Sequence, residues 1–257
     1  MDNHGKPLLV LKIGGNQVED GEFLAGFVAA IQAMRSEYRL ILVHGGGKEI
    51  ADLHRIFGVP FGTVDGLRVT SPESMRLVEM ALNGSVNTRL VRWLVNGQVD
   101  AIGISGVDMG LLRVVPLQIN GRDLGLVGQI TSVNGEALYR LLDLGLLPVV
   151  SPVSLGEDGL VYNVNADHAA TAIARAVQAS RLIFVTNVPG VQVAGRTVRA
   201  LAPAQVQQLI ADGVISGGMI PKVRAALDAV HSGVFQAVIT DLAGLAREDG
   251  GTAVVKA

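Results

Sequence analysis

Short runs of valine, isoleucine and leucine alternate with helix-length amphipathic segments along most of this 257-residue chain. Runs that are apolar throughout are typical of strands buried on both faces, and such strands belong to parallel sheets covered by helices. The alternation therefore predicts an α/β fold, a three-layer αβα sandwich around an open, mostly parallel central sheet. The clearest runs are LLVLKI (8–13), RLILV (39–43), DAIGIS (100–105), LLPVVSP (146–152), RLIFVT (181–186), VFQAVIT (234–240) and GTAVVK (251–256).

Helical periodicity fills most of the chain between these strands. A hairpin is predicted where LRVVPLQI (112–119) and LVGQITSVN (126–134) flank NGRDLG, and an irregular hairpin over 60–69. The best lobe boundary lies near Ala179, which divides the chain into lobes 1–179 and 180–257. The expected helices cover 20–36, 47–57, a region from 72 to 94 interrupted near Gly84, 135–144, 164–179, 203–212 and 219–231.

Composition excludes several classes of protein. The formal net charge of −2 gives no general attraction to nucleic acid or anionic membrane. The absence of cysteine excludes disulfides, thiolate metal sites and a cysteine nucleophile. The N-terminal apolar run is too short for a signal peptide, and no uncharged apolar stretch of roughly 18 residues exists. We therefore expect a soluble, cytoplasmic protein.

Three turns follow predicted strands and mark the expected ligand edge of the sheet: KIGGN (12–16), VHGGGKE (43–49) and VTNVPGV (185–191). VHGGGKE is not a Walker A loop, because Glu49 follows Lys48 where Ser or Thr is needed. The dinucleotide fingerprint also fails, since Ile50 replaces its third glycine. Three successive glycines opening a helix exceed the needs of a tight turn, which favours a bound anion.

Two lysines occupy unusual positions. Lys12 interrupts an apolar strand, so it either extends its amine past the strand end or faces a phosphate. Lys222 lies in the first turn of a helix, where a cation opposes the helix dipole and calls for an anionic partner.

Asn165 and Asp167 suit an N-cap and a first helical turn, a purely structural explanation for both. His44 is either catalytic or, more simply, a hydrogen-bonded strand-end histidine. No zinc-like spacing and no Ser–His–Asp arrangement is present.

Six motifs occur in one order along nearly the whole chain. Together they resemble the amino acid kinase family, and GLRVT with NVNAD is similar to the branch that phosphorylates N-acetyl-L-glutamate in arginine biosynthesis. The motifs are KIGG (12–15), VHGGG (43–47), GLRVT (66–70), VNADHAATA (164–172), TNVPGV (186–191) and GGMIPKV (217–223).

The resemblance implies transfer of the ATP γ-phosphoryl group to the side-chain carboxylate of N-acetyl-L-glutamate, with Mg²⁺ carried by the nucleotide. It implies that lobe 1–179 binds the amino acid and dimerises, while lobe 180–257 binds ATP. Lys12 and Lys222 resemble the two lysines that neutralise the transferring group, and Asp167 the aspartate that orients both. On this basis Lys48 follows glycines as the Walker lysine does but does not share the role of that lysine.

The resemblance also implies binding residues by position. The acceptor would be held by Gly46, Gly47, Arg68 and Asn163. The nucleotide would be held by Gly14, Gly15, Asn187, Val188, Pro189, Gly190, Val191, Gln192, Val214, Ile215 and Ser216.

Asn187 departs from the family pattern, because many members carry an acidic residue there. Related kinases of lysine biosynthesis, which act on an aminoadipate group attached to a carrier protein, resemble the chain at this point and form the nearest rival. A catalytically silent amino-acid sensor is a second rival, and a dehydrogenase is disfavoured by the missing fingerprint.

Because the first strand begins near residue 8, no room is left for the extra N-terminal helix of arginine-inhibited hexamers. We therefore expect an arginine-insensitive homodimer.

Overall fold

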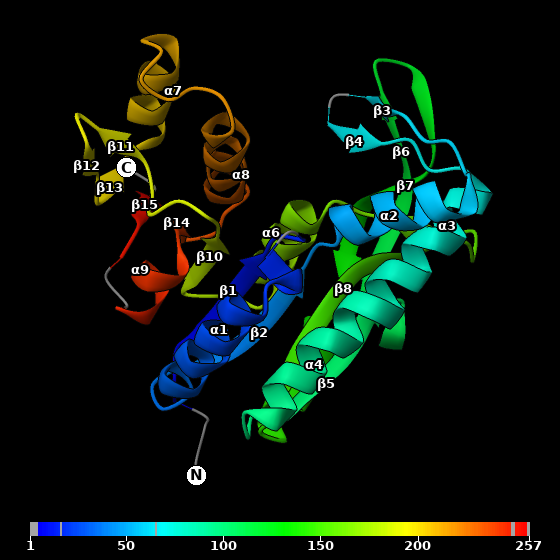
Figure 1. The fold of residues 1–257 in the computed structure, drawn as a ribbon, viewed down its shortest axis with the longest axis horizontal. Helices are drawn as coiled ribbons and strands as arrows, with labels where there is room; N and C mark the ends of the chain where they lie inside the picture. Colours follow the sequence, from blue (N-terminus) through cyan, green and yellow to red (C-terminus); the bar gives the residue numbers. More distant parts are fainter. Residues whose placement is uncertain (1–4, 16, 65, 248–249, 256–257) are drawn as a thin grey trace.

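The computed structural model describes residues 5–15, 17–64, 66–247 and 250–255. An eleven-stranded sheet runs through the molecule in the order β13-β15-β14-β10-β1-β2-β8-β6-β7-β9, with β5 paired to β8 (Figure 1). Its strands are β1 Leu8–Ile13, β2 Arg39–His44, β5 Ala101–Gly106, β6 Leu112–Ile119, β7 Arg122–Val133, β8 Leu147–Gly156, β9 Val161–Asn163, β10 Arg181–Val185, β13 Ala200–Leu201, β14 Gln236–Thr240 and β15 Thr252–Val255.

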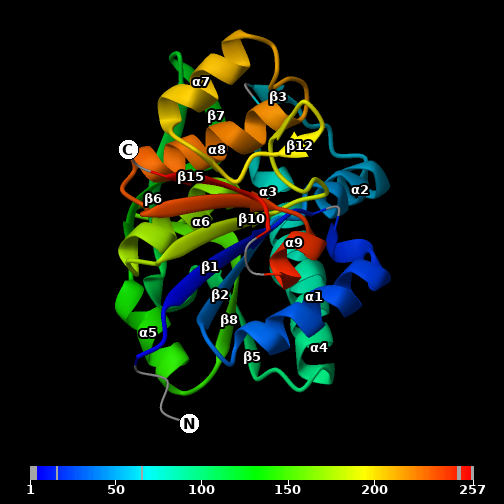
Figure 2. The same ribbon diagram turned by 90° about the vertical axis from the view of Figure 1, so that its left-hand side faces the viewer.

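Strand β1 lies at the centre of the sheet and is parallel to both of its neighbours. Lys12 is in register with Val43 of β2 and with Phe184 of β10, and β10 in turn is parallel to β14. The carboxyl ends of these strands therefore meet at one edge, as Figure 2 shows. Because β1 and β10 come from the two predicted lobes, one sheet continues across the predicted boundary near Ala179. The division into two functional lobes stays a prediction.

Alternate residues of β1 point to opposite faces of the sheet, as strand geometry requires. Leu8 and Val10 pack into the core that is shared with α5 (Gly135–Asp143), α6 (Ala166–Ala176), α7 (Pro203–Ala211) and α8 (Met219–His231). Leu9, Leu11 and Ile13 pack instead against α1 (Gly21–Met34), α4 (Asn87–Asn96) and α9 (Leu242–Ala246). The three-layer sandwich is confirmed, and the alternation directs Lys12 towards the α6 side.

The helical region expected from 72 to 94 is continuous. It consists of α3 (Pro72–Glu79), a π-helical segment η2 (Met80–Val86) and α4. The residues at both junctions, Glu79 and Asn87, keep right-handed helical dihedral angles. The interruption predicted near Gly84 is therefore a widening of the helix, a feature that often occurs near functional sites. It packs beside α2 (Gly47–Phe57).

The β6–β7 hairpin is confirmed, but its turn is shorter than predicted. Asn120 and Gly121 both have positive φ angles, of 50° and 73°, which is the conformation that two-residue hairpin turns need. The expected hairpin near 60–69 contains β3 (Thr63–Val64) and β4 (Leu67–Arg68). Short elements that the sequence did not predict are η1 (Gln17–Glu19), η3 (Asp108–Gly110), β9, the β11 (Gln192–Val193) and β12 (Arg196–Thr197) pair, β13 and α9.

Three predicted positions lie outside the described residues, as do residues 1–4: Asn16 of the first glycine turn, Asp65 of the hairpin predicted over 60–69 and Lys256 of the last strand. Within the described part of the chain, each helix is too short or too polar to cross a lipid bilayer.

Candidate active site

The three predicted turns line two neighbouring cavities at the carboxyl edge of the sheet. The first, of about 380 Å³, is lined by Lys12, Lys48 and Lys222 together with the turns that follow β1 and β10, and is named the lysine cavity. The second, of about 250 Å³, is lined by the Gly45–Gly47 turn, Arg68 and the start of α6, and is named the arginine cavity. Four residues line both cavities, namely Lys12, Gly15, Gly47 and Asp167.

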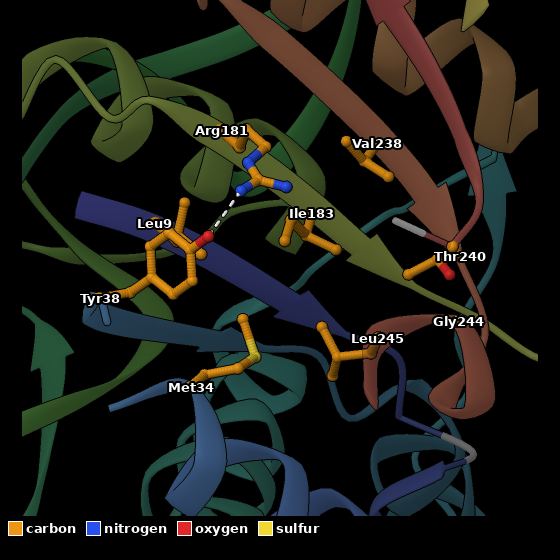
Figure 3. A pocket seen from close by; sticks show the side chains of 10 residues that line it. Leu9, Met34, Tyr38, Arg181, Ile183, Val238, Thr240, Gly244 and Leu245 are labelled. Atoms are coloured by element: carbon orange, nitrogen blue, oxygen red, sulfur yellow. Dashed lines mark hydrogen bonds between the residues drawn. The ribbon is translucent and has the colours of Figure 1, made fainter. Parts of the chain in front are cut away.

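A smaller hollow lies away from this edge, among α1, β1, β10, β14 and α9. There the Arg181 Nη2 donates a hydrogen bond to the Tyr38 hydroxyl at 3.1 Å (Figure 3). Its volume of about 20 Å³ is room for little more than one water molecule. It is too small to hold a nucleotide or an amino acid.

Lys12 and Asp167 form an ion pair at the wall between the two cavities. The Lys12 Nζ lies 2.7 Å from the Asp167 Oδ1, and the two side chains are 18% and 32% exposed. Asp167 is fixed locally, because its backbone N–H donates to the Asn165 Oδ1 at 2.7 Å. The N-cap predicted for Asn165 is confirmed. The cap uses the Asn165 side chain and the Asp167 backbone N–H, so the Asp167 carboxylate can pair with Lys12.

Lys222 reaches the lysine cavity from the first turn of α8. Its Nζ donates to the Asn187 Oδ1 at 2.9 Å, a neutral acceptor on the turn after β10. Burial lowers the pKa of Lys222, and the nearby charge of Lys12 lowers it further. The expected contact between Asp167 and Lys222 is not among the ion pairs of the described residues. Asn187 takes that place, so the second lysine lacks a carboxylate there.

The two glycine turns touch backbone to backbone. A Cβ on Gly15 would lie 2.6 Å from the Gly47 backbone nitrogen, and a Cβ on Gly46 would lie 2.5 Å from the Leu82 Cδ2. The packing of the protein backbone therefore requires glycine at position 15, and a side chain at position 46 would have to displace Leu82. A Cβ on Gly47 would meet no protein atom within 4 Å. Gly47 faces open space, which is where a ligand would lie.

The arginine cavity contains the guanidinium group of Arg68, which can donate further hydrogen bonds. The Arg68 guanidinium lies 4.2 Å from the centre of the Phe61 ring, and its Nη2 donates to the Gly47 carbonyl at 3.2 Å. Its Nη1 is buried and has no hydrogen-bond partner among the described residues. Burial also lowers the pKa of Arg68. A buried donor of this kind calls for an anionic ligand.

Asn163 lines the same cavity at the end of β9. Its Nδ2 donates to the Thr70 Oγ1 at 3.2 Å, which fixes the orientation of the amide. The rest of the wall includes the apolar side chains of Leu67, Leu82 and Val127. The cavity therefore combines a cation and an amide with an apolar wall, a combination that suits a small acylated amino acid.

The predicted nucleotide loops are only partly brought to the lysine cavity. Gly14, Gly15 and Asn187 line it, whereas Pro189 lines a separate hollow of about 390 Å³ beside Arg199 and Asp241. Val191 and Ile215 are buried in the core, so only their backbone groups are available to a ligand. Neither cavity is lined by the remaining predicted residues, Val188, Gly190, Gln192, Val214 and Ser216.

Sequence reasoning missed several wall residues of the lysine cavity. Lys48 and Gln17 line it, as do Phe184, Thr186 and Pro221. Lys48 was visible next to the third glycine but failed the Walker pattern. Gln17 carries no motif, and only its hydrogen bond from the Gly14 N–H, at 3.0 Å, connects it to the site.

His44 is fully buried behind the glycine turn. Its Nδ1 lies 3.1 Å from the Gly45 carbonyl oxygen, and its Nε2 accepts from the Asn87 Nδ2 at 3.0 Å. Burial lowers its pKa to about 4, which keeps the ring neutral at ordinary pH. The prediction of a hydrogen-bonded strand-end histidine is confirmed.

Residues 7–241 match the amino acid kinase family. The chain is 54% identical to the acetylglutamate kinase of Chloroflexus aurantiacus, over 95% of this chain and 94% of that protein. It is 50% identical to the acetylglutamate kinase of Roseiflexus sp., over 97% and 94% of the two chains.

Solved structures share the fold. A crystal structure of a Streptococcus mutans protein has 32% identity and a TM-score of 0.78, covering 91% of this chain and 94% of that chain. Carbamate kinase from Giardia lamblia bound to AMP-PNP has 15% identity and a TM-score of 0.72, covering 98% and 99%. The second likeness concerns the fold alone.

Proposed function

This chain belongs to the amino acid kinase family, and from that premise we propose that it transfers the γ-phosphoryl group of ATP to the side-chain carboxylate of N-acetyl-L-glutamate. The product is N-acetyl-L-glutamyl 5-phosphate, an intermediate of arginine biosynthesis. The observation that carries this assignment is the pair of cavities that share one wall at Lys12, Gly15, Gly47 and Asp167. The curated relatives, at 43–54% identity, do not favour the aminoadipate or sensor alternatives.

The reaction needs alignment and charge neutralisation more than proton transfer. A carboxylate oxygen of the acceptor forms a bond to the γ-phosphorus, and the bond from that phosphorus to the bridging oxygen breaks. ADP leaves with the electron pair, and no proton has to be removed, because the nucleophile is already ionised. The barrier is dominated by bringing two anions together, so positioned cations are the effective catalysts.

Lys12 and Lys222 supply these cations. Lys12 stands at the shared wall, where the two substrates would meet, and Asp167 holds its amine in place at 2.7 Å. Among the described residues the partner of Lys222 is the neutral Asn187 oxygen, so its charge remains available to the transferring group. We assign Asp167 as a positioning residue that acts through Lys12.

The arginine cavity receives the acceptor. The Nη1 of Arg68, which has no partner within the described part of the chain, suits the α-carboxylate, and Asn163 suits the acetamido group. The backbone amides of Gly46 and Gly47 open α2 and point their dipole towards the reacting carboxylate. With the acceptor bound in this way, the side-chain carboxylate of N-acetyl-L-glutamate would lie at the wall that the two cavities share.

The lysine cavity receives the nucleotide. Gly14 and Gly15 would approach its phosphates, and the loops Asn187–Gln192 and Val214–Ser216 would contribute mainly backbone groups. Within the described residues no cluster of three acidic or histidine side chains could hold a metal ion, and the Asp167 carboxylate already pairs with Lys12. We therefore propose that Mg²⁺ arrives bound to the phosphates, where it would supply further charge neutralisation.

We also propose that the enzyme works in the cytoplasm as a homodimer, as the family resemblance implies. Light scattering on a size-exclusion column tests the homodimer directly, since a monomer or a hexamer would give a different mass.

The decisive experiment is a coupled ADP-release assay with three acceptors compared side by side. N-acetyl-L-glutamate should be turned over, while free glutamate lacks the acetamido group that Asn163 would hold and should be a much poorer substrate. Turnover of an aminoadipate derivative without turnover of N-acetyl-L-glutamate would contradict the proposal. ATP consumption without any acyl phosphate, detected by hydroxylamine trapping, would also contradict it.

A further inference from the structure

Three lysines line the lysine cavity, and the mechanism above uses only two of them. The third, Lys48, is the second residue of α2 and its side chain is 54% exposed. It lines the lysine cavity but not the arginine cavity. It is thus close to the proposed nucleotide and away from the acceptor.

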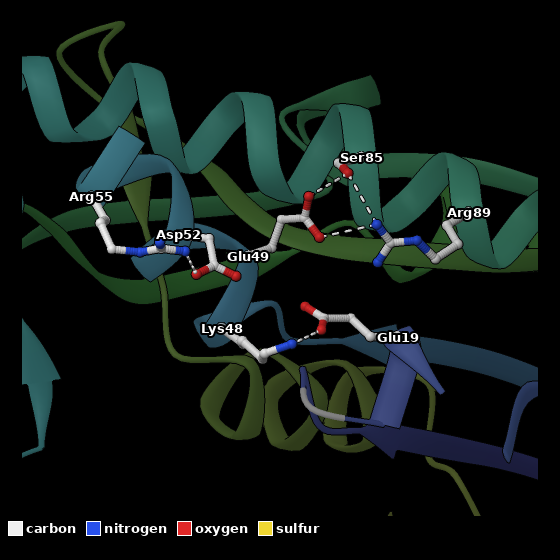
Figure 4. Close-up of polar contacts among 7 residues, drawn as sticks. All are labelled: Glu19, Lys48, Glu49, Asp52, Arg55, Ser85 and Arg89. Carbon is white, nitrogen blue, oxygen red and sulfur yellow. Dashed lines mark hydrogen bonds and ion pairs between the residues drawn. The ribbon is translucent and has the colours of Figure 1, made fainter. Parts of the chain in front are cut away.

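Lys48 has an internal partner in this structure. Its Nζ donates to the Oε2 of Glu19, a residue of the short helix η1, as Figure 4 shows. This hydrogen bond and the charge of Glu19 raise the pKa of Lys48, so the amine remains a cation. The Glu19 side chain is 24% exposed. An exposed ion pair of this kind contributes little to stability, so a polyanionic ligand can replace the carboxylate.

The same short helix covers a second donor of the cavity wall. The Gly14 backbone N–H donates to the Gln17 Oε1 at 3.0 Å. Gly14 is among the amides expected to approach the ATP phosphates. Two side-chain oxygens of η1, one from Gln17 and one from Glu19, therefore accept hydrogen bonds from donors of this cavity wall, the Gly14 N–H and the Lys48 amine.

We propose that Lys48 is a third phosphate-binding cation of the lysine cavity, and that Glu19 and Gln17 occupy the donors of this wall until the nucleotide phosphates replace them. This inference rests on the assignment of ATP to the lysine cavity. Its physical basis is charge. Lys12 shares its charge with Asp167, so apart from Lys48 the described residues of this cavity give a bound triphosphate one lysine, Lys222, whose partner is a neutral oxygen.

The role of Lys48 differs from that of the two catalytic lysines. Lys12 lies at the wall shared with the arginine cavity, whereas Lys48 lies outside that cavity. A contact to phosphates that do not transfer is made equally in the ground state and the transition state. It therefore changes affinity for the nucleotide and leaves kcat nearly unchanged.

The test is calorimetric titration with Mg-ATP in the absence of acceptor. Lys48→Met should raise the Kd for Mg-ATP about tenfold, the loss expected for one charge-assisted hydrogen bond. Glu19→Gln should lower the Kd about two- to fivefold, because it removes a competitor for the amine. In the Lys48→Met background, Glu19→Gln should have no effect on the Kd.

The matched control is the exposed ion pair between Arg140 and Glu136 on α5, which lies outside both cavities. Arg140→Met and Glu136→Gln should leave the Kd for Mg-ATP unchanged. Thermal unfolding of all variants, compared with this control pair, separates loss of binding from loss of folding. If Lys48→Met folds poorly, Glu19→Gln tests the proposal through its lower Kd without removing a positive charge.

Each result decides a different question. A wild-type protein that does not bind Mg-ATP contradicts the nucleotide assignment itself. A wild-type protein that binds Mg-ATP, with an unchanged Kd in Lys48→Met, overturns the role of Lys48 and leaves the proposed function standing. A higher Kd in Glu19→Gln would show that Glu19 supports binding, which overturns its role as a competitor.

Discussion

The two cavities share a wall, but they hold their cations in opposite ways. In the arginine cavity, Arg68 lies over the Phe61 ring and keeps a buried Nη1 with no partner among the described residues. In the lysine cavity, each of the three lysines has a side-chain oxygen of the protein as its partner, from Asp167, Asn187 or Glu19.

This difference shows two ways of preparing a site for an anion. The arginine cavity leaves a desolvated donor unsatisfied, which favours one small carboxylate in one orientation. The lysine cavity satisfies its donors with side-chain oxygens of the protein, which avoids leaving unpaired charge in the free enzyme, and we propose that those of Glu19 and Gln17 are replaced by the nucleotide. Substitutions on the two sides should therefore affect different kinetic constants.

The largest effect is expected at Lys222. Lys222→Ala removes the lysine whose partner in the described structure is a neutral oxygen, so kcat should fall on the order of 10²–10³-fold, the loss typical of a removed charge-stabilising donor. The measurement is steady-state turnover with both substrates saturating, and Arg140→Ala on the surface of α5 is the control. A near-normal kcat would remove Lys222 from the mechanism.

Arg68 should affect the acceptor alone. Arg68→Met is expected to raise the KM for N-acetyl-L-glutamate about 10- to 100-fold, because one charged hydrogen bond is lost, while the KM for ATP stays near its normal value. Arg55→Met, an exposed arginine of α2 paired with Asp52, is the control. Equal increases in both KM values would contradict the separation of the two cavities.

Gly47 tests the open space at the shared wall. Gly47→Ala places a methyl group where no protein atom lies within 4 Å, so the thermal midpoint should be unchanged or slightly higher. Turnover should still fall about tenfold, because the methyl group intrudes on the reacting groups.

Two further glycine substitutions serve as controls for Gly47→Ala. Gly62→Ala, also free of neighbours, should change neither turnover nor stability, whereas Gly15→Ala should lower stability, because its Cβ would press on the Gly47 backbone. Full activity in Gly47→Ala would exclude a ligand at that point.

The smallest effect concerns alkaline pH. Because burial and the charge of Lys12 lower the pKa of Lys222, this amine loses its proton below the ordinary lysine value of 10.5. The ratio kcat/KM for ATP should therefore fall as pH rises towards that value. Lys222→Arg keeps its charge at high pH, so its profile should stay flat there, even if its activity is lower.

Stability changes in the opposite direction in the same range. The unfolded chain binds the Lys222 proton more tightly than the folded chain does, so this group makes the free energy of unfolding rise with pH between the two pKa values. Circular dichroism at each pH separates the two effects. A pH profile of Lys222→Arg that falls like the wild-type profile would assign the loss to another group.

The main elements of the fold could be predicted because their signals are local. LLVLKI and RLIFVT are mostly apolar, and both form strands close to the predicted bounds. Elements such as α9 and the β11–β12 pair were missed, because they are too short for a periodic pattern to show. The widened helix near Gly84 was read as an interruption, since a glycine in a helical pattern does not distinguish a break from a π-helical segment.

The candidate site was predictable in part. Lys12, the glycine turns and Lys222 carried unusual charge or unusual glycine content, and all of them line the cavities. The wall residues Gln17 and Lys48 were not predicted, because one has no motif and the other failed the pattern of an unrelated loop. Val191 and Ile215 match a family motif, yet their side chains belong to the core.

The sequence by itself determined the order of strands and helices, the parallel character of the sheet and the turns at its ligand edge. Those properties follow from hydrophobic period and glycine position, which act over a few residues. The motifs already indicated Asp167 as the partner of Lys12. Only the tertiary structure decided the other partners: Asn187 for Lys222, Glu19 for Lys48 and the Phe61 ring for Arg68. Partner choice depends on strand register and helix placement across distant parts of the chain, which no local pattern encodes.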